Sequence, residues 1–138
     1  MRSVHCLMVL LAVMLAACTG TSARPESTLA GTAWKLTGWS EAGISPADFT
    51  ITANFADGRV TGKAAVNNYF ASYAEGPENR LTMSEAGSTM MAGPPAAMQA
   101  ERTYLRLLGQ VRRYSRTGQV LTLADPAGQM LLEFAPAP

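Results

Sequence analysis

From residue 29 onward, hydrophobic and polar residues alternate with a period of two over most of the chain. In the segment 49–55 a hydrophobic side chain occupies every second position, which is typical of a strand with one buried face. Asp57-Gly58 follows this segment and predicts a two-residue hairpin turn, because both turn positions require a positive φ. The same pattern predicts further strands in the segments 33–39, 59–66, 68–73, 80–85, 111–116, 119–123 and 129–134.

One segment, 96–108, departs from this alternation and has the period of an α-helix. Tyr104 and Leu108 fall on the same helical face, as expected for a helix with one buried side. Pro94-Pro95 precedes the segment, and the fixed φ of proline suits the first turn of a helix. Gly109 follows it and is expected to end the helix.

The order of these segments predicts an α+β fold. We expect a curved antiparallel sheet of about seven or eight strands, covered by one helix that is inserted before the last three strands. Residues 135–138 follow the last expected strand, and we expect them to fray.

The first residues of the chain have a different character. A short polar start that contains Arg2 is followed by an unbroken apolar run over 6–15 and then by Leu15-Ala16-Ala17-Cys18. A positive start, a short apolar core and small residues before the cut describe a secretory signal. The apolar run is shorter than the roughly 20 residues that span a bilayer. Leu-Ala-Ala-Cys resembles the bacterial lipobox, in which the cysteine receives a diacylglyceryl group and becomes the new N-terminus.

The lipobox resemblance divides the chain into three parts: a lipoprotein signal peptide over 1–17, a lipidated N-terminus with a flexible tether over 18–28, and a folded domain over 29–135. Cys18 is then the lipid attachment residue. Two alternatives remain: an ordinary secretory signal cut near Ala17, with Cys18 incidental, and an uncleaved membrane anchor.

Removal of residues 1–17 changes what chemistry is expected. The remaining chain has ten basic and ten acidic residues, so its side-chain charge is about zero and predicts no binding to nucleic acid. It has no histidine, and its one cysteine is Cys18, so a Ser-His-Asp triad and a free thiol nucleophile are both excluded. Zinc, copper and iron sites normally use these same two residue types. We therefore predict a protein that is not an enzyme and has no cofactor and no metal.

Two sets of residues are candidates for a functional site. Asn67, Asn68, Tyr69 and Tyr73 are the candidate binding surface, although asparagines in such a position more often hold a turn through bonds to the backbone. Glu101 falls on the apolar side of the expected helix, and a charge there needs an arginine or backbone amides as partners. We expect Glu101 to be a structural buried charge, and a perturbed carboxylate in a site is the alternative.

Five arginines could form a basic patch that faces anionic lipid, although solvated arginines are the more common arrangement. They are Arg102, Arg106, Arg112, Arg113 and Arg116.

Four stretches resemble the META domain, the HslJ-like family of bacterial envelope proteins. They are the opening Leu29–Leu36 (LAGTAWKL), the segment Gly62–Tyr73 with its Asn-Asn-Tyr, the segment Thr89–Leu108 with its Met-Met-Ala, and the closing Leu121–Phe134. The resemblance covers nearly all of residues 29–135. It implies a link to envelope stress and secretion rather than to a defined catalytic reaction.

The chain departs from the family at two positions. Val66 and Gly93 stand where the family often has cysteines. The loss of both together fits two positions that are close in space. It also removes any redox role that such a pair would support.

These observations predict a membrane-anchored envelope lipoprotein with a non-enzymatic META/HslJ-like domain. The domain is expected to be a binding or stress-related assembly-support module, with the membrane as one partner, through the lipid on Cys18, and an unidentified envelope protein as the other. Thr19 after the cysteine resembles outer-membrane sorting, so the expected location is the outer membrane, facing the periplasm. A periplasmic small-ligand binder is the alternative, and a hydrolase that uses only carboxylates is a third.

Overall fold

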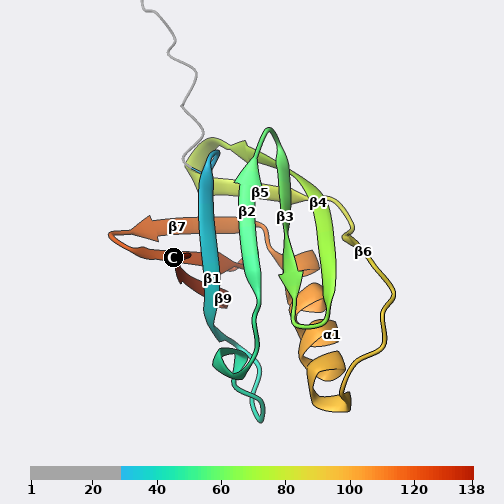
Figure 1. Cartoon of the computed structure of the whole chain (residues 1–138). Coiled ribbons are helices and arrows are strands. Elements are labelled where there is room, and N and C mark those ends of the chain that lie inside the picture. The colour runs from blue at the N-terminus through green and yellow to red at the C-terminus, as the bar shows by residue number, and fades with distance from the viewer. Residues whose placement is uncertain (1–28) are drawn as a thin grey trace, which may run out of the picture.

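The structure, a computed structural model, describes residues 29–138 (Figure 1). The expected signal peptide, Cys18 and the tether lie outside these residues. Residues 29–138 form one α-helix and nine strands, with two 3-10 turns at Pro46–Asp48 and Pro77–Asn79. The strands are β1 Thr32–Trp39, β2 Thr52–Ala56, β3 Arg59–Ala64, β4 Asn67–Gly76, β5 Arg80–Met83, β6 Gly87–Ser88, β7 Arg113–Thr117, β8 Val120–Ala124 and β9 Met130–Pro136, and the helix α1 is Pro95–Gln110.

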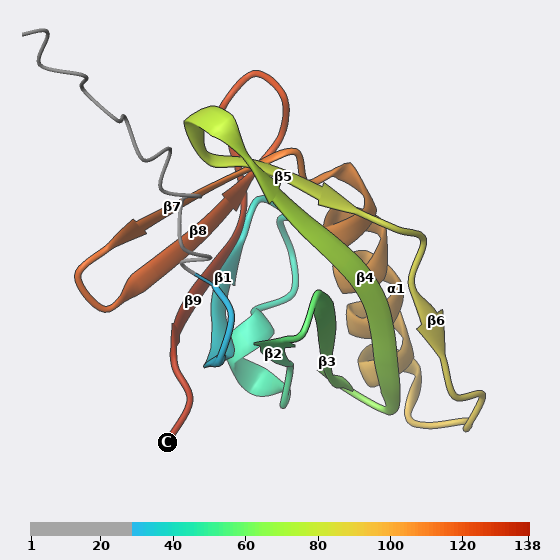
Figure 2. The ribbon, with the colours of Figure 1, turned by 90° about the horizontal axis from the view of Figure 1, so that it is seen from above.

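The strands form a mostly β architecture, an antiparallel barrel of eight strands with the one helix. The strand order is β3-β2-β1-β9-β8-β7-β5-β4, and β3 also pairs with β4, so the sheet closes on itself. The short β6 adds to the outside of β4. The antiparallel pairing and the helix before the last three strands confirm the expected order, whereas the expected open curved sheet is a closed one. Figure 2 shows the strands around the interior, with α1 on the side of β3 and β4.

The hairpin between β2 and β3 forms where the sequence predicts it. Asp57 and Gly58 have φ values of 49° and 73°, as a tight turn with two positive φ angles requires. The ladder pairs Phe55 with Val60, and both side chains are buried. This local signal therefore sets the register of the two strands.

The next turn, between β3 and β4, differs from the prediction. The strand expected over 59–66 ends at Ala64, because Ala65 has a φ of 76° and cannot continue an extended chain. β4 then alternates strictly from residue 67 to residue 74. The side chains at 67, 69, 71 and 73 are buried, and those at 68, 70, 72 and 74 are exposed. One side of this strand faces the core and the other faces solvent.

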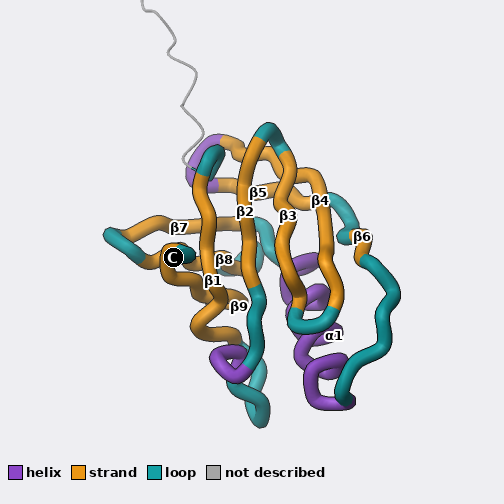
Figure 3. Tube along the Cα trace, in the orientation of Figure 1, coloured by secondary structure: helices purple, strands orange, loops and turns teal. Residues whose placement is uncertain are grey.

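The helix covers part of the barrel and contacts β3 and β9. Its buried side chains include Tyr104 and Leu108, as the periodicity predicts, and also Glu101. The expected end of the helix before Gly109 is wrong by two residues, because the helix continues from Leu108 to Gln110 and Val111 caps it. Figure 3 shows the loop that leads from β6 into this helix.

The C-terminal segment does not fray at the point expected. Ala135 and Pro136 belong to β9 and pair with Lys35 and Trp34 of β1. The backbone N–H of Ala137 also donates to the carbonyl of Ala33 over 3.0 Å. Pairing with a strand a hundred residues earlier orders these residues, and their own sequence gives no sign of it.

No helix within residues 29–138 is long and apolar enough to cross a membrane.

Candidate functional site

Glu101 binds the turn between β3 and β4 rather than an arginine. Its Oε2 accepts the backbone N–H groups of Val66 over 3.2 Å and Asn67 over 2.7 Å. Its Oε1 accepts the side-chain amide of Asn67 over 2.7 Å. Because Ala65 is held at a positive φ, these bonds secure a turn that is unfavourable for a residue other than glycine. Glu101 is 5% exposed, so the structure places its carboxylate inside the protein with backbone amides as partners.

The side chain of Asn67 links this turn to the loop before the helix. Its amide group also donates to the carbonyl of Met91 over 3.1 Å. Its Oδ1 accepts the N–H of Met91 over 2.7 Å and the hydroxyl of Thr89 over 2.9 Å. Every polar atom of the buried side chain is therefore satisfied, and Asn67 has no capacity left for a ligand.

Tyr69 and Tyr104 form a second buried contact between β4 and α1. Their hydroxyl oxygens are 2.6 Å apart, and the Tyr69 hydroxyl donates to the carbonyl of Thr52 over 2.8 Å. The rings meet edge to face, with centroids 5.3 Å apart. Burial raises the pKa of both hydroxyls above the ordinary tyrosine value, although the bond from Tyr104 partly offsets the rise at Tyr69. Both phenols are thus held neutral inside the protein.

Val66 and Gly93 lie in direct contact, as the paired loss of cysteines predicts. A Cβ atom added to Gly93 would lie 2.7 Å from Cγ2 of Val66 and 3.4 Å from its Cβ. The valine methyl groups therefore fill the space that a side chain at position 93 would need. A residue without a Cβ is required there for as long as position 66 is valine.

The four residues of the expected binding surface do not form a surface together. Asn67, Tyr69 and Tyr73 are buried, at 2%, 2% and 8% exposure, and Asn68 alone is exposed. Tyr73 packs edge to face against Phe55, with ring centroids 5.1 Å apart. The cause is the strict alternation of β4, which directs all its odd-numbered side chains toward the core from Asn67 to Tyr73. The hypothesis of an exposed Asn-Tyr patch is therefore wrong for three of its four residues.

A different surface, the β2–β4 groove, lies on the outer face of β2, β3 and β4. It has a volume of about 590 Å³. Its lining contains two cations, an exposed aromatic ring, polar side chains and no acidic residue: Thr52, Asn54, Arg59, Thr61, Gly62, Lys63, Asn68, Tyr69 and Phe70. Asn68 thus keeps a place in a candidate site, whereas Tyr69 lines the groove but stays buried.

The sequence does contain a signal for this groove, although the expected binding surface did not include it. Phe70 is an aromatic residue at a polar position of β4, and it is 49% exposed. Arg59, Thr61 and Lys63 share the outer face of β3, because they are two residues apart on the same strand. Phe70 stands where the alternation of β4 places solvent-facing residues, beside the row of polar and basic residues on β3. Such an aromatic residue indicates an outer surface that is available for binding.

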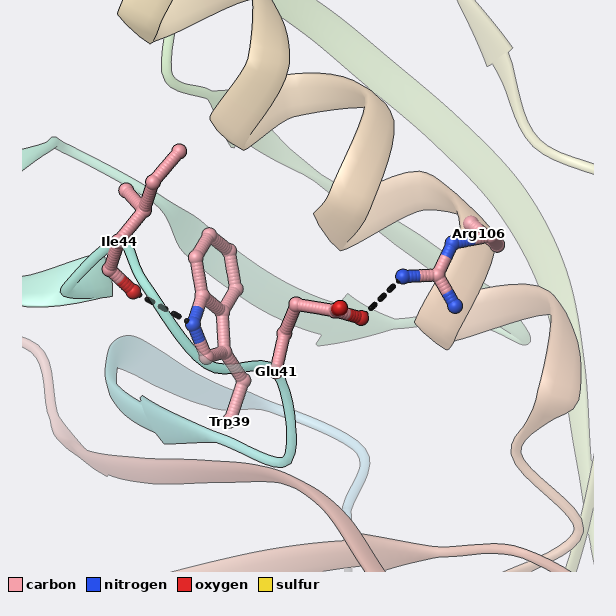
Figure 4. Close-up of polar contacts among 4 residues, drawn as sticks. All are labelled: Trp39, Glu41, Ile44 and Arg106. Atoms are coloured by element: carbon pink, nitrogen blue, oxygen red, sulfur yellow. Dashed lines mark hydrogen bonds and ion pairs between the residues drawn. The ribbon is translucent and has the colours of Figure 1, made fainter.

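Three of the five arginines considered as a basic patch have separate partners. Arg106 forms an ion pair with Glu41, in the loop that follows β1, while Trp39 donates its indole N–H to the carbonyl of Ile44 over 2.9 Å (Figure 4). Arg112, which follows α1, donates to the carbonyl of Gly109 in the last turn of the helix over 3.0 Å and to that of Val111 over 2.6 Å.

Arg116 lies 5.3 Å above the ring of Trp34, on yet another element. Three of the five cations are therefore engaged at different places, which disfavours a single anion site made from all five.

No group of three or more His, Cys, Asp or Glu that could hold a metal ion occurs in the described part of the chain.

Comparison with known proteins identifies the domain. A family model described as the META domain matches residues 27–138. Among solved structures, the chain is similar to a protein from Burkholderia xenovorans solved by NMR, with 27% identity and a TM-score of 0.65, over 79% of this chain and 83% of that one. A DUF4847 family protein from Bacteroides vulgatus shares the fold, with 14% identity and a TM-score of 0.58, over 78% of this chain and 94% of that one. No curated protein matches.

Proposed function

The chain belongs to the META domain family, and on this premise we propose that it is a membrane-anchored envelope lipoprotein whose META domain is a non-enzymatic binding module. The anchor is lipid on Cys18, and residues 19–28 tether the domain to the outer membrane on its periplasmic side. The domain supports the assembly of other envelope components by binding them.

The anchor rests on the start of the sequence. A positive residue, a short apolar core and Leu15-Ala16-Ala17-Cys18 follow one another in the order that lipoprotein processing requires. The family model begins at residue 27, nine residues after the cysteine, which leaves a short polar segment between the lipid and the domain.

The β2–β4 groove is the observation that carries the binding role. The polar groups buried between the strands and the helix are satisfied by one another, so the Glu101–Asn67 contact supports the fold. The groove, in contrast, presents Arg59 and Lys63, and neither side chain forms an ion pair with the described part of the chain. Two cations without an ion pair, beside an exposed aromatic ring on the same face, favour recognition over a purely structural role.

Crosslinking in intact cells, followed by mass spectrometry of the membrane-extracted protein, tests this proposal. We expect a reproducible envelope protein partner that disappears in Cys18→Ser, because loss of the anchor removes the domain from the membrane surface. The matched control is Ser22→Ala, in the same tether, which keeps the cysteine. If the protein carries lipid but crosslinks to no protein, the assembly-support role is wrong.

The groove also favours a second candidate, a periplasmic binder of a small ligand. In that case a defined small molecule raises the melting temperature of the protein in the absence of any partner protein. If the ligand raises the melting temperature of the Phe70→Ala variant by the same amount, the groove is not the site.

A further inference from the structure

We propose that the β2–β4 groove binds an anionic oligosaccharide, with a sugar ring against Phe70 and acidic groups at Arg59 and Lys63. This inference deepens the proposed binding function, on which it rests, by naming the chemical class of the ligand and the residues that recognise it.

The aromatic ring is held in place at the surface. Gly87 of β6 lies against the far end of the Phe70 ring, and a Cβ atom there would lie 2.5 Å from Cζ. The ring therefore rests over a residue that has no side chain, while Arg59 lies over it with 5.8 Å between the guanidinium carbon and the ring centroid. A ring that is fixed in this way and 49% exposed offers an apolar surface at low entropic cost to a sugar, whose C–H groups form an apolar face.

The Cα atoms of the two basic residues lie on either side of this ring along β3, and the Arg59 side chain reaches back over the ring. Phe70 pairs across the strands with Thr61, and Thr61 lies midway between Arg59 and Lys63 in the strand. Four residues of extended chain separate the Cα atoms of the two basic residues by about 13 Å. Because the Arg59 guanidinium lies over the ring, this arrangement favours a ligand that extends along β3, with one acidic group beside the ring at Arg59 and another toward Lys63.

The groups between the cations suit hydroxyl recognition. The hydroxyl of Thr61 and the side-chain amide of Asn68 line the groove and form no hydrogen bond with the described part of the chain. Between them they supply both donors and acceptors, which is what sugar hydroxyls require. No acidic side chain lines the groove, so nothing there repels a carboxylate or a phosphate.

The groove fits a membrane surface less well than a sugar chain. Recognition of anionic lipid typically uses a cluster of about four to eight basic residues, and the groove holds two. The folded domain also has no large excess of positive charge to reinforce the attraction.

Titration calorimetry on the full chain, purified from the producing cells in a mild detergent, tests the proposal. The probes are trigalacturonate and a hyaluronan tetrasaccharide, both of which carry carboxylates on a sugar chain. Maltotriose tests whether binding needs charge, and tripolyphosphate tests whether it needs a sugar. Phosphatidylglycerol vesicles test the lipid alternative. We expect at least one acidic oligosaccharide to bind, maltotriose and tripolyphosphate to bind at least tenfold more weakly than it does, and the vesicles to bind no more tightly than it does.

Variants locate the site. Phe70→Ala and Lys63→Ala should each weaken binding of the acidic oligosaccharide at least tenfold, and Phe70→Tyr and Lys63→Arg should retain it. Arg113→Ala and Val120→Ala, which remove an exposed cation and an exposed apolar side chain outside the groove, are the matched controls and should change nothing. All six alter exposed positions, so unchanged melting curves are expected to confirm that each variant folds.

Three outcomes overturn the proposal. The first is that neither acidic oligosaccharide binds. The second is that tripolyphosphate or the vesicles bind as tightly as the acidic oligosaccharide and that Phe70→Ala does not weaken this binding, and the third is that the control variants lose as much affinity as the groove variants. The lipid on Cys18 and the crosslinked partners are measured separately on the same preparation. Failure of the saccharide inference is therefore distinguishable from failure of the proposed lipoprotein function.

Discussion

The carboxylate of Glu101, on α1, accepts the side-chain amide of Asn67, at the start of β4, over 2.7 Å. The same carboxylate accepts two backbone N–H groups of the turn between β3 and β4. The helix is thus joined to the barrel by a buried charge that no cation neutralises at this contact. Hydrogen bonds to a charged acceptor are about twice as strong as neutral ones, so we expect this contact to dominate the local stability of the turn.

Loss of the Glu101 carboxylate should therefore destabilise the domain. Glu101→Ala leaves two backbone N–H groups without their acceptor, and the free energy of unfolding should fall by about 2–4 kcal/mol. Urea denaturation measures this change. Glu85→Ala, at an exposed glutamate, is the matched control and should change stability by less than about 0.5 kcal/mol. Equal effects of the two variants would show that the buried contact contributes nothing special.

The contact between Val66 and Gly93 predicts that a disulfide forms when both residues are replaced. A Cβ atom at position 93 would lie 3.4 Å from the Cβ of Val66, close to the usual spacing of about 3.5–4.5 Å in disulfides. Val66→Cys with Gly93→Cys should form this bond under oxidising conditions and raise the free energy of unfolding by about 3 kcal/mol, because the bond closes a long loop in the unfolded chain. Thiol counting and denaturation with and without reductant measure both effects. Two free thiols after oxidation would contradict the contact.

A methyl group added at position 93 should instead be harmful. In Gly93→Ala the new Cβ meets Cγ2 of Val66 at 2.7 Å, so overpacking should cost about 1–3 kcal/mol. Val66→Ala should recover most of this loss in the double variant. The control is Gly109→Ala, inside α1, where an added Cβ meets nothing within 4 Å and should stabilise the helix by up to about 1 kcal/mol. Urea denaturation of the four variants gives the coupling energy, and additive effects would contradict the clash.

The buried tyrosine pair predicts a loss of stability at alkaline pH. Burial raises the pKa of Tyr69 and Tyr104, whereas in the unfolded chain both ionise near pH 10. Below pH 10 both states keep the protons, and above it the unfolded state loses them first, so the free energy of unfolding should fall as pH rises. The slope is about 1.4 kcal/mol per pH unit for each tyrosine. Denaturation between pH 8 and 12 should show that the free energy of unfolding falls less steeply with pH in the double variant Tyr69→Phe, Tyr104→Phe than in the unchanged protein. Identical slopes in the two proteins would contradict a neutral buried pair.

Local signals in the sequence predicted local structure well. Asp57-Gly58 identified its hairpin because positive φ angles at two neighbouring positions depend on those residues alone. The helix was predicted from its own period, including the burial of Glu101. The relation between Val66 and Gly93 was predicted from two simultaneous departures from a family pattern, and the structure places the two residues in contact.

Features that depend on distant pairing were missed. Closure of the barrel depends on β5 meeting β7 through a single residue pair, Arg80 and Arg113, and no pattern in either strand encodes that meeting. Ala135 and Pro136 are ordered by β1 for the same reason. The candidate surface failed because a period of two gives the relative phase of Tyr69 and Phe70 but not which of them faces the core.

Intact mass spectrometry of the protein extracted from membranes tests the central claim, that this META domain is held at the envelope by lipid on its first mature residue. We predict a chain that begins at Cys18, carries the mass of a diacylglyceryl group with further acylation, and fractionates with the outer membrane. In Cys18→Ser the lipid mass should be absent. A chain that is cut elsewhere or left uncut, with Cys18 unmodified, would contradict the account.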